Sequence, residues 1–226
     1  MKDDVIVDVV DLSKNYANKP VLNQVSFGLS KGQVLGIIGP NGSGKTTLLN
    51  IIMGMMRPLS GIVRIADSVR IGMSVSRKGF FDDMSVEKNL MLFARLHNIS
   101  EKAVRETMME FGIDFGHLSY GRLSAGMKQR VSLVYPFAMV NDLVLLDEPT
   151  NHLDIDSILL LRRKIIALKQ AGVAFLLASH VVSDLERVCD QIIFLRNGRI
   201  LENQPLGELL KNFGSLEDAY LKVGML

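Results

Sequence analysis

Continuous apolar runs of four or five residues recur along the chain and predict buried strands. They cover residues 34–38, 143–146 and 175–178, and an amphipathic segment over residues 157–170 predicts a helix between the last two. Strands that are covered on both faces are apolar at successive positions, and parallel strands are joined by a crossover helix. The pattern therefore predicts a βαβ unit in an α/β fold.

Shorter patterns surround this core. Residues 5–10 and 21–29 are expected to form strands of an amino-terminal sheet, and alternation over residues 61–73 predicts a small strand pair. Apolar positions at helical spacing over residues 85–111 predict a helical insert. Near the carboxyl end, Asn197-Gly198 between two apolar segments predicts a β-hairpin, and the last residues are expected to be helical.

Composition narrows the class of protein. The 226 residues, 48% of them apolar, are enough for one domain with a sizeable core. A net charge of +2 without a run of like charges argues against direct nucleic-acid binding. Cys189 has no partner for an intrachain disulfide and is expected to be a small core residue. No apolar run approaches the ~20 residues of a membrane helix, and the amino terminus lacks a signal pattern, so a cytoplasmic chain is expected.

Residues 39–46 read Gly-Pro-Asn-Gly-Ser-Gly-Lys-Thr, a complete Walker A phosphate loop between a predicted strand and a predicted helix. Glycines let successive backbone N–H groups wrap a phosphate, and the helix start favours negative charge. Lys45 should bridge the β- and γ-phosphates, and the Thr46 hydroxyl should contact Mg²⁺. The alternative is a glycine-rich turn without a ligand. The predicted nucleotide-binding residues are Gly39, Pro40, Asn41, Gly42, Ser43, Gly44, Lys45, Thr46 and Thr47.

A second string follows the apolar run at residues 143–146, where Asp147 and Glu148 match a Walker B motif. Asp147, at the strand tip, is expected to hold Mg²⁺, and Glu148 is expected to polarise an attacking water. A solvated acidic turn would be ordinary for this string alone. Its place about 100 residues after a Walker A loop favours the catalytic interpretation.

The third string, residues 123–130, makes the chain resemble the ATP-binding subunits of ABC transporters. Their signature is Leu-Ser-Gly-Gly-Gln, from which the sequence departs at Ala125 and Met127 and keeps Ser124 and Gly126. The resemblance implies that the two retained residues contact the γ-phosphate of ATP bound on an opposing subunit. The alternative is that serine and glycine before a helix are only a cap.

Other positions are carried over by the same resemblance. Tyr16 corresponds to the aromatic residue that stacks on adenine, although a tyrosine packed at a sheet edge would look the same. Residues 151–154, ending in Asp154, resemble the D-loop that crosses the dimer interface, and His180 resembles the switch histidine. Ser76 stands where family members carry a glutamine, so it is expected to reach the metal only through a water.

The resemblance covers nearly the whole chain and implies a single ABC ATP-binding domain over residues 1–226. The implied fold is a P-loop NTPase with a RecA-like, mostly parallel core sheet. A small amino-terminal antiparallel β-subdomain and an α-helical subdomain at about residues 77–137 complete it. The family works as a dimer that hydrolyses ATP with Mg²⁺ on the inner face of the cell membrane and drives a separate integral-membrane permease. Residues 128–130 and 215–221 resemble bacterial exporters, so export is the expected direction.

Three other functions remain open at this point. A soluble ABC ATPase acting on ribosomes or DNA usually has two such domains or a long coiled-coil insertion, and the sequence has neither. A small-molecule kinase or a GTPase would need an acceptor lid or a guanine motif, which we do not find. A binding module without hydrolysis would follow if Ser76 abolished the positioning of water.

Overall fold

The larger of the two sheets in the computed structural model contains the predicted parallel strands. The structure describes residues 4–17, 19–74, 79–139 and 141–224. The sheet order is β5-β6-β7-β3-β8-β9, with parallel pairing from β5 to β8 and antiparallel pairing of β8 with β9. The three predicted apolar runs are confirmed as β3, β6 and β7, and the Asn197-Gly198 hairpin is confirmed between β8 and β9. The strands are β3 (Val34–Ile38), β5 (Ile71–Met73), β6 (Leu143–Asp147), β7 (Ala174–Ser179), β8 (Gln191–Arg196) and β9 (Arg199–Pro205).

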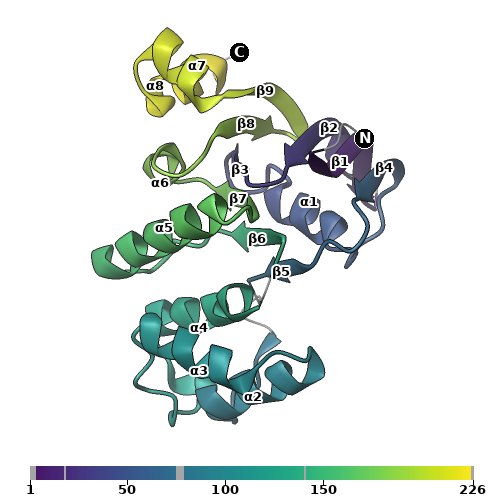
Figure 1. Ribbon diagram of the computed structural model, residues 1–226. Helices are drawn as coiled ribbons and strands as arrows, with labels where there is room; N and C mark the ends of the chain where they lie inside the picture. Colours follow the sequence, from purple (N-terminus) through teal and green to yellow (C-terminus); the bar gives the residue numbers. More distant parts are fainter. Residues whose placement is uncertain (1–3, 18, 75–78, 140, 225–226) are drawn as a thin grey trace.

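A smaller antiparallel sheet has the order β2-β1-β4 and lies beside α1 (Figure 1). Its strands are β1 (Val5–Tyr16), β2 (Lys19–Ser30) and β4 (Ser60–Ile65). The predicted strand pair within residues 61–73 is wrong, because β4 pairs with β1 whereas β5 pairs with β6. Alternation shows which face of a strand is covered, but it does not identify the neighbouring strand.

The contacts of Arg70 explain why β5 joins the larger sheet. The backbone N–H of Asp142 donates to the Arg70 carbonyl at 2.9 Å, and the Arg70 guanidinium lies 3.1 Å from the Asp142 carboxylate. The hydrogen bonds from Arg70 lower the pKa of Asp142 below its usual range. These contacts bring the chain onto β6 immediately before β5 begins.

The helices form two groups in Figure 1, one around the larger sheet and one below it. Around the sheet lie α1 (Lys45–Ile52), α5 (Ile155–Gln170), α6 (Val182–Glu186), α7 (Leu206–Phe213) and α8 (Leu216–Gly224). Below it lie α2 (Val86–Leu96), α3 (Glu101–Glu110), the short 3₁₀ helix η2 (Tyr120–Arg122) and α4 (Ala125–Ala138). The predicted helical insert is therefore two helices, each capped by a serine, Ser85 and Ser100. No helix in the described part of the chain is long and apolar enough to cross a membrane.

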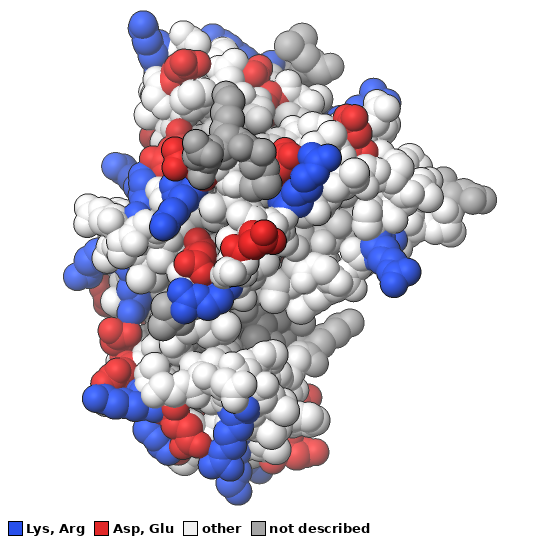
Figure 2. Space-filling model, turned by 45° about the vertical axis from the view of Figure 1, so that its right-hand side comes forward, with Lys and Arg blue, Asp and Glu red and all other residues white. Residues whose placement is uncertain are grey.

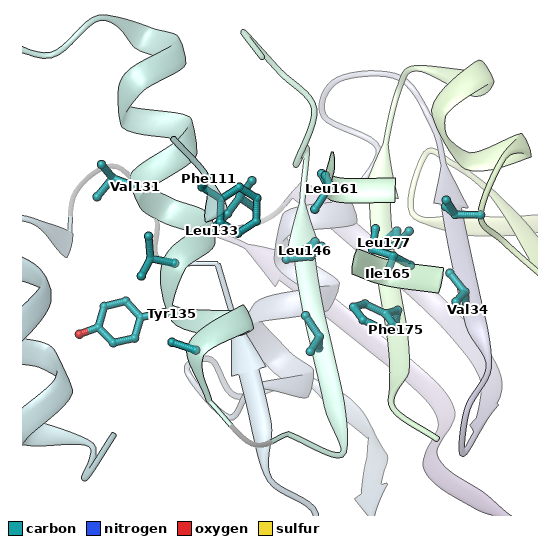
Figure 3. Packing of buried hydrophobic residues seen from close by; sticks show 14 of the residues in the cluster. Val34, Phe111, Val131, Leu133, Tyr135, Leu146, Leu161, Ile165, Phe175 and Leu177 are labelled. Carbon is teal, nitrogen blue, oxygen red and sulfur yellow. The ribbon is translucent and has the colours of Figure 1, made fainter. Parts of the chain in front are cut away.

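Alternate residues of each central strand pack on opposite faces of the larger sheet. In β3, Val34 and Ile38 belong to one buried cluster, and Leu35 and Ile37 belong to the other. Figure 3 shows the first cluster, where α5 side chains such as Leu161 lie over the sheet. Cys189 is buried in this cluster, and its burial raises the thiol pKa, as expected of a core residue. The two buried faces make the sheet a rigid base for the loops at its edge.

Candidate active site

The phosphate loop connects β3 to α1 and is held against the turn between β8 and β9. The Gly198 N–H donates to the Ser43 carbonyl at 3.1 Å. Gly44, the N-cap of α1, has φ of 108°, and an added Cβ would lie 2.8 Å from the Val21 carbonyl oxygen. Only glycine fits both conditions. Among the described residues no side chain caps α1, so the N–H groups at its start remain for an anion.

Lys45 projects from the first turn of α1 into the centre of the loop. Its side chain is 6% exposed, and Nζ donates to the Gly39 carbonyl at 2.7 Å. The same Nζ lies 3.3 Å from Glu148 Oε1. The ammonium group is therefore held by the loop and faces the carboxylate that follows β6. A buried ammonium in this position is suited to phosphate oxygens.

Asp147 and Thr46 face each other across the site. The Thr46 hydroxyl donates to Asp147 Oδ2 at 2.6 Å, whereas Asp147 Oδ1 is buried and has no hydrogen-bond partner among the described residues. Burial raises the pKa of Asp147, and the hydrogen bond from Thr46 opposes that rise. A hydroxyl and a carboxylate with a free oxygen are ligands suited to Mg²⁺, which usually takes the rest of its ligands from water and phosphate. The residues present therefore fit the expected ion.

Glu148 connects the other two predicted catalytic residues. While Oε1 faces Lys45, Oε2 lies 2.7 Å from Nδ1 of His180. His180 follows β7 directly, and the Glu148 N–H donates to the carbonyl of Ala178 in that strand at 2.8 Å. Pairing of β6 with β7 thus places the two side chains beside each other. The Glu148 carboxylate therefore lies between the ammonium of Lys45 and the imidazole of His180.

Tyr16, Ser124 and Asp154 make their contacts outside this cluster. The Tyr16 hydroxyl donates to Met56 Sδ at 3.1 Å, and its ring is half exposed near Lys14. Ser124 caps α4 by accepting a hydrogen bond from the Met127 N–H, and Asp154 caps α5 in the same way through Ser157. These contacts explain the local structure without a ligand. Ser76 lies outside the described residues.

Gly126 and Gln129 are both in contact with the turn that carries Glu148. Gly126 lies against the His152 carbonyl, because an added Cβ would be 2.6 Å from that oxygen. The Gln129 side-chain amide donates to the Pro149 carbonyl at 3.0 Å. Sequence reasoning identified Gly126 through the signature but assigned no role to Gln129, and no local pattern indicates a bond that spans twenty residues.

A cavity of about 700 Å³ continues from the cluster toward the helical group. Its lining passes from Thr46, Asp147 and Glu148 to Met53 after α1 and Tyr135 of α4.

On the face shown in Figure 2, basic and acidic side chains are interspersed and form no continuous basic surface. This face resembles an ordinary solvated surface more than a nucleic-acid-binding surface.

Comparisons with known proteins identify the family of this chain. Residues 22–151 match the family model described as ABC transporter. The ABC transporter ATP-binding protein NatA of Bacillus subtilis (strain 168) is 28% identical, over 98% of each chain. The bacitracin transport ATP-binding protein BcrA of Bacillus licheniformis is 30% identical over 91% of this chain and 72% of its own.

A solved ATP-binding subunit of an ABC transporter superposes with a TM-score of 0.86 at 28% identity, covering 97% of this chain and 99% of its own. The expected P-loop NTPase fold is thereby confirmed. The match to the family model spans both Walker strings and the signature segment, and it includes Lys45, Asp147 and Glu148. The chain therefore belongs to the ABC transporter family, as a nucleotide-binding subunit that hydrolyses ATP.

Proposed function

We propose that two copies of this subunit enclose ATP and drive a separate membrane permease. Each ATP would lie between the Walker residues of one copy and Ser124 and Gly126 of the other. The observation that carries the proposal is the Glu148 carboxylate, which contacts both Lys45 and His180 beside the Thr46–Asp147 pair. In this proposal, the arrangement would bring a base, a phosphate-binding cation and a metal-binding pair to one point.

Hydrolysis needs a positioned water and a stabilised phosphoryl group more than covalent chemistry. Glu148 would accept a proton from the water, and His180 would orient the carboxylate and the γ-phosphate. Lys45 and the N–H groups at the start of α1 would stabilise negative charge in the transition state. Mg²⁺, held by Thr46 and Asp147, would neutralise charge on the phosphates when bound. Tyr16 would stack on the adenine ring.

Several observations support the transport role. The relative from Bacillus licheniformis is named for bacitracin transport, and the names of the relatives compared give no support to action on ribosomes or DNA. Among the described residues, no helix is long and apolar enough to cross a membrane. The subunit would then work on the inner face of the cell membrane, with export as the direction we infer. Loss of the γ-phosphate would reopen the pair and reset the permease.

Glu148→Gln tests both hydrolysis and the composite site. We expect ATP affinity to be retained and kcat to fall by about 10²–10⁴-fold, because the amide cannot accept the proton. An ATP-bound dimer should then accumulate and be visible by light scattering in saturating Mg-ATP. The matched control is Glu148→Gln combined with Lys45→Met, which should remain monomeric. A monomeric Glu148→Gln variant in saturating ATP would contradict the sandwich.

The membrane partner requires a separate experiment. Tagged subunit purified from detergent-solubilised membranes should recover an integral-membrane protein, and Mg-ATP turnover should be measured on that complex. Recovery of ribosomes without a membrane protein would replace the transporter function with the soluble alternative. Absence of magnesium-dependent turnover in both the isolated subunit and the complex would leave only a binding module.

A further inference from the structure

The turn after β6 begins and ends in an unfavourable backbone conformation. Glu148 has φ of +47° and His152 has φ of +65°, so both lie in the left-handed region. Residues with a Cβ adopt this region at a cost, and they remain there only where neighbouring structure holds them. Because φ and ψ of Glu148 determine where its side chain points, whatever holds this turn also directs the carboxylate.

Helix α4 holds the turn at both ends. The buried amide of Gln129 donates to the carbonyl oxygens of Pro149 at 3.0 Å and of Glu148 at 3.4 Å. Three residues earlier, Gly126 lets the His152 carbonyl approach to a distance that a side chain would not allow. Residues three apart share one face of a helix. One face of α4 therefore supports the turn from Glu148 to His152.

The bonds of Gln129 do not serve its own helix. Asn141, a second buried amide just beyond α4, donates to Pro136 and Met139, which lie within or at the end of that helix. Those two bonds complete the C-terminal end of the helix. Gln129 instead reaches residues 19 and 20 positions away and satisfies carbonyl groups in the catalytic turn. The Gln129 amide therefore holds the backbone of that turn in place.

We propose that Gln129 is a positioning residue for Glu148. By holding the carbonyls of Glu148 and Pro149, it maintains the backbone that aims the carboxylate at Lys45 and His180. The inference rests on the proposed function, because the position of Glu148 matters only if Glu148 acts on water. Ser124 is the N-cap of helix α4, so a single helix joins the residue proposed to meet ATP on the other copy to the proposed base of its own site.

Gln129→Met tests the proposal, because methionine keeps the length of the side chain but donates no hydrogen bond. We expect kcat for Mg-ATP to fall about 10- to 100-fold, as for a small misplacement of a catalytic group, with the ATP Kd within about twofold of wild type. Asn141→Leu is the matched control, since it removes a buried amide with two carbonyl partners from the same helix. Its thermal stability should fall comparably while kcat stays close to wild type.

A double-mutant cycle separates positioning from general structural damage. If Gln129 acts through Glu148, adding Gln129→Met to Glu148→Gln should cause no further loss in single-turnover rate. If Gln129→Met lowers the single-turnover rate of Glu148→Gln by the same factor by which it lowers the rate of wild type, the proposal is overturned. Gln129→Glu, which keeps the shape but replaces the donor with an acceptor, serves as a second variant if Gln129→Met does not fold, and it should lose kcat at least as strongly.

The outcomes distinguish this inference from the proposed function. A wild-type subunit without turnover, alone or with its membrane partner, would contradict the proposed function. An active wild type together with a Gln129→Met variant that keeps kcat within about twofold would overturn the positioning role alone.

Discussion

Helices α1 and α4 both begin at residues proposed to contact ATP, but their first turns are built differently. The start of α1 has no side-chain cap in the described structure, follows a glycine with φ of 108° and carries the buried Lys45. The start of α4 is exposed and capped by its own Ser124, whose hydroxyl accepts from the Met127 N–H. One helix start leaves its N–H groups for a ligand, whereas the other satisfies one of them internally.

In our proposal, this difference separates the part of the site that one chain completes from the part that a second copy would complete. Lys45, Asp147, Glu148 and His180 meet within a single copy, through strands that belong to one sheet. Ser124 makes a complete cap without a ligand, so its γ-phosphate contact requires a second copy in our proposal. A motif whose residues meet each other can be recognised from one chain. A motif that meets another chain looks like an ordinary helix start.

Mixing two inactive subunits gives the largest expected effect. It tests whether the helix starts of α1 and α4 act on the same ATP from different copies. Lys45→Met removes the ammonium from the α1 side, and Ser124→Asp retains a good cap while placing a negative charge toward the γ-phosphate. Each variant alone should lose Mg-ATP turnover by about 100-fold or more, because every composite site contains one defect. A mixed dimer has one site with both defects and one with neither. Random mixing should therefore restore up to about a quarter of wild-type activity.

Turnover in the mixture is measured against each variant alone at the same total protein concentration. A double variant carrying both substitutions on one chain is the control and should show no recovery when mixed with either single variant. Failure of the two single variants to complement each other, while both remain folded and form dimers, would mean that each site is complete within one chain.

Sequence patterns predicted the strand, loop and helix on the α1 side of the site. A continuous apolar run gave β3 at its observed bounds, and the glycine positions explain the loop, since Gly44 needs a positive φ and open space. The acidic pair at the end of β6 was predicted for a similar reason, because an apolar strand that ends in carboxylates places them at the sheet edge. Local chemistry alone determines these features.

Long-range pairing could not be predicted in the same way. Alternation over residues 61–73 indicated strands, but it did not show that β4 joins β1 while Arg70 directs β5 onto β6. The hydrogen bonds of Gln129 were also missed, because its partners lie about twenty residues away and are backbone carbonyls with no sequence signature. Contacts that depend on how helices pack over a sheet leave no local periodicity.

Thr47→Glu tests whether the start of α1 is kept free for an anion. The substitution adds an acidic residue to its first turn, as α2 and α5 already have. The first turn of α1 has no acidic residue, so a carboxylate at this position should stabilise the helix start by about 0.3–1 kcal/mol. The same charge should repel a triphosphate and raise the ATP Kd about tenfold or more. Calorimetric melting without nucleotide and titration with Mg-ATP measure the two effects. Thr47→Gln is the neutral control, and a Thr47→Glu variant with unchanged affinity would place the phosphates elsewhere.

Asp154→Ala gives the smallest effect and tests a helix start of the α4 type. Asp154 caps α5 by accepting from the Ser157 N–H, so its loss should cost about 1 kcal/mol of unfolding free energy. The hydrogen bonds from Ser157 lower the pKa of Asp154 in the folded chain. The ionised cap therefore stabilises the fold above the unfolded pKa of about 3.9, and this contribution is lost as pH falls through the lower folded value.

The difference in unfolding free energy between wild type and Asp154→Ala, measured by urea unfolding, should be constant above about pH 4. It should shrink toward zero as the pH falls below that value. Asp154→Ser is the matched variant, because serine restores the cap without the charge and should recover most of the stability. A difference that does not change with pH would show that the carboxylate charge contributes nothing to the cap. If Asp154 also crosses the dimer interface, as its resemblance to the D-loop implies, Asp154→Ser should still impair the ATP-dependent dimer. An unimpaired dimer would mean that Asp154 only caps α5 within its own chain and makes no contact that the dimer needs.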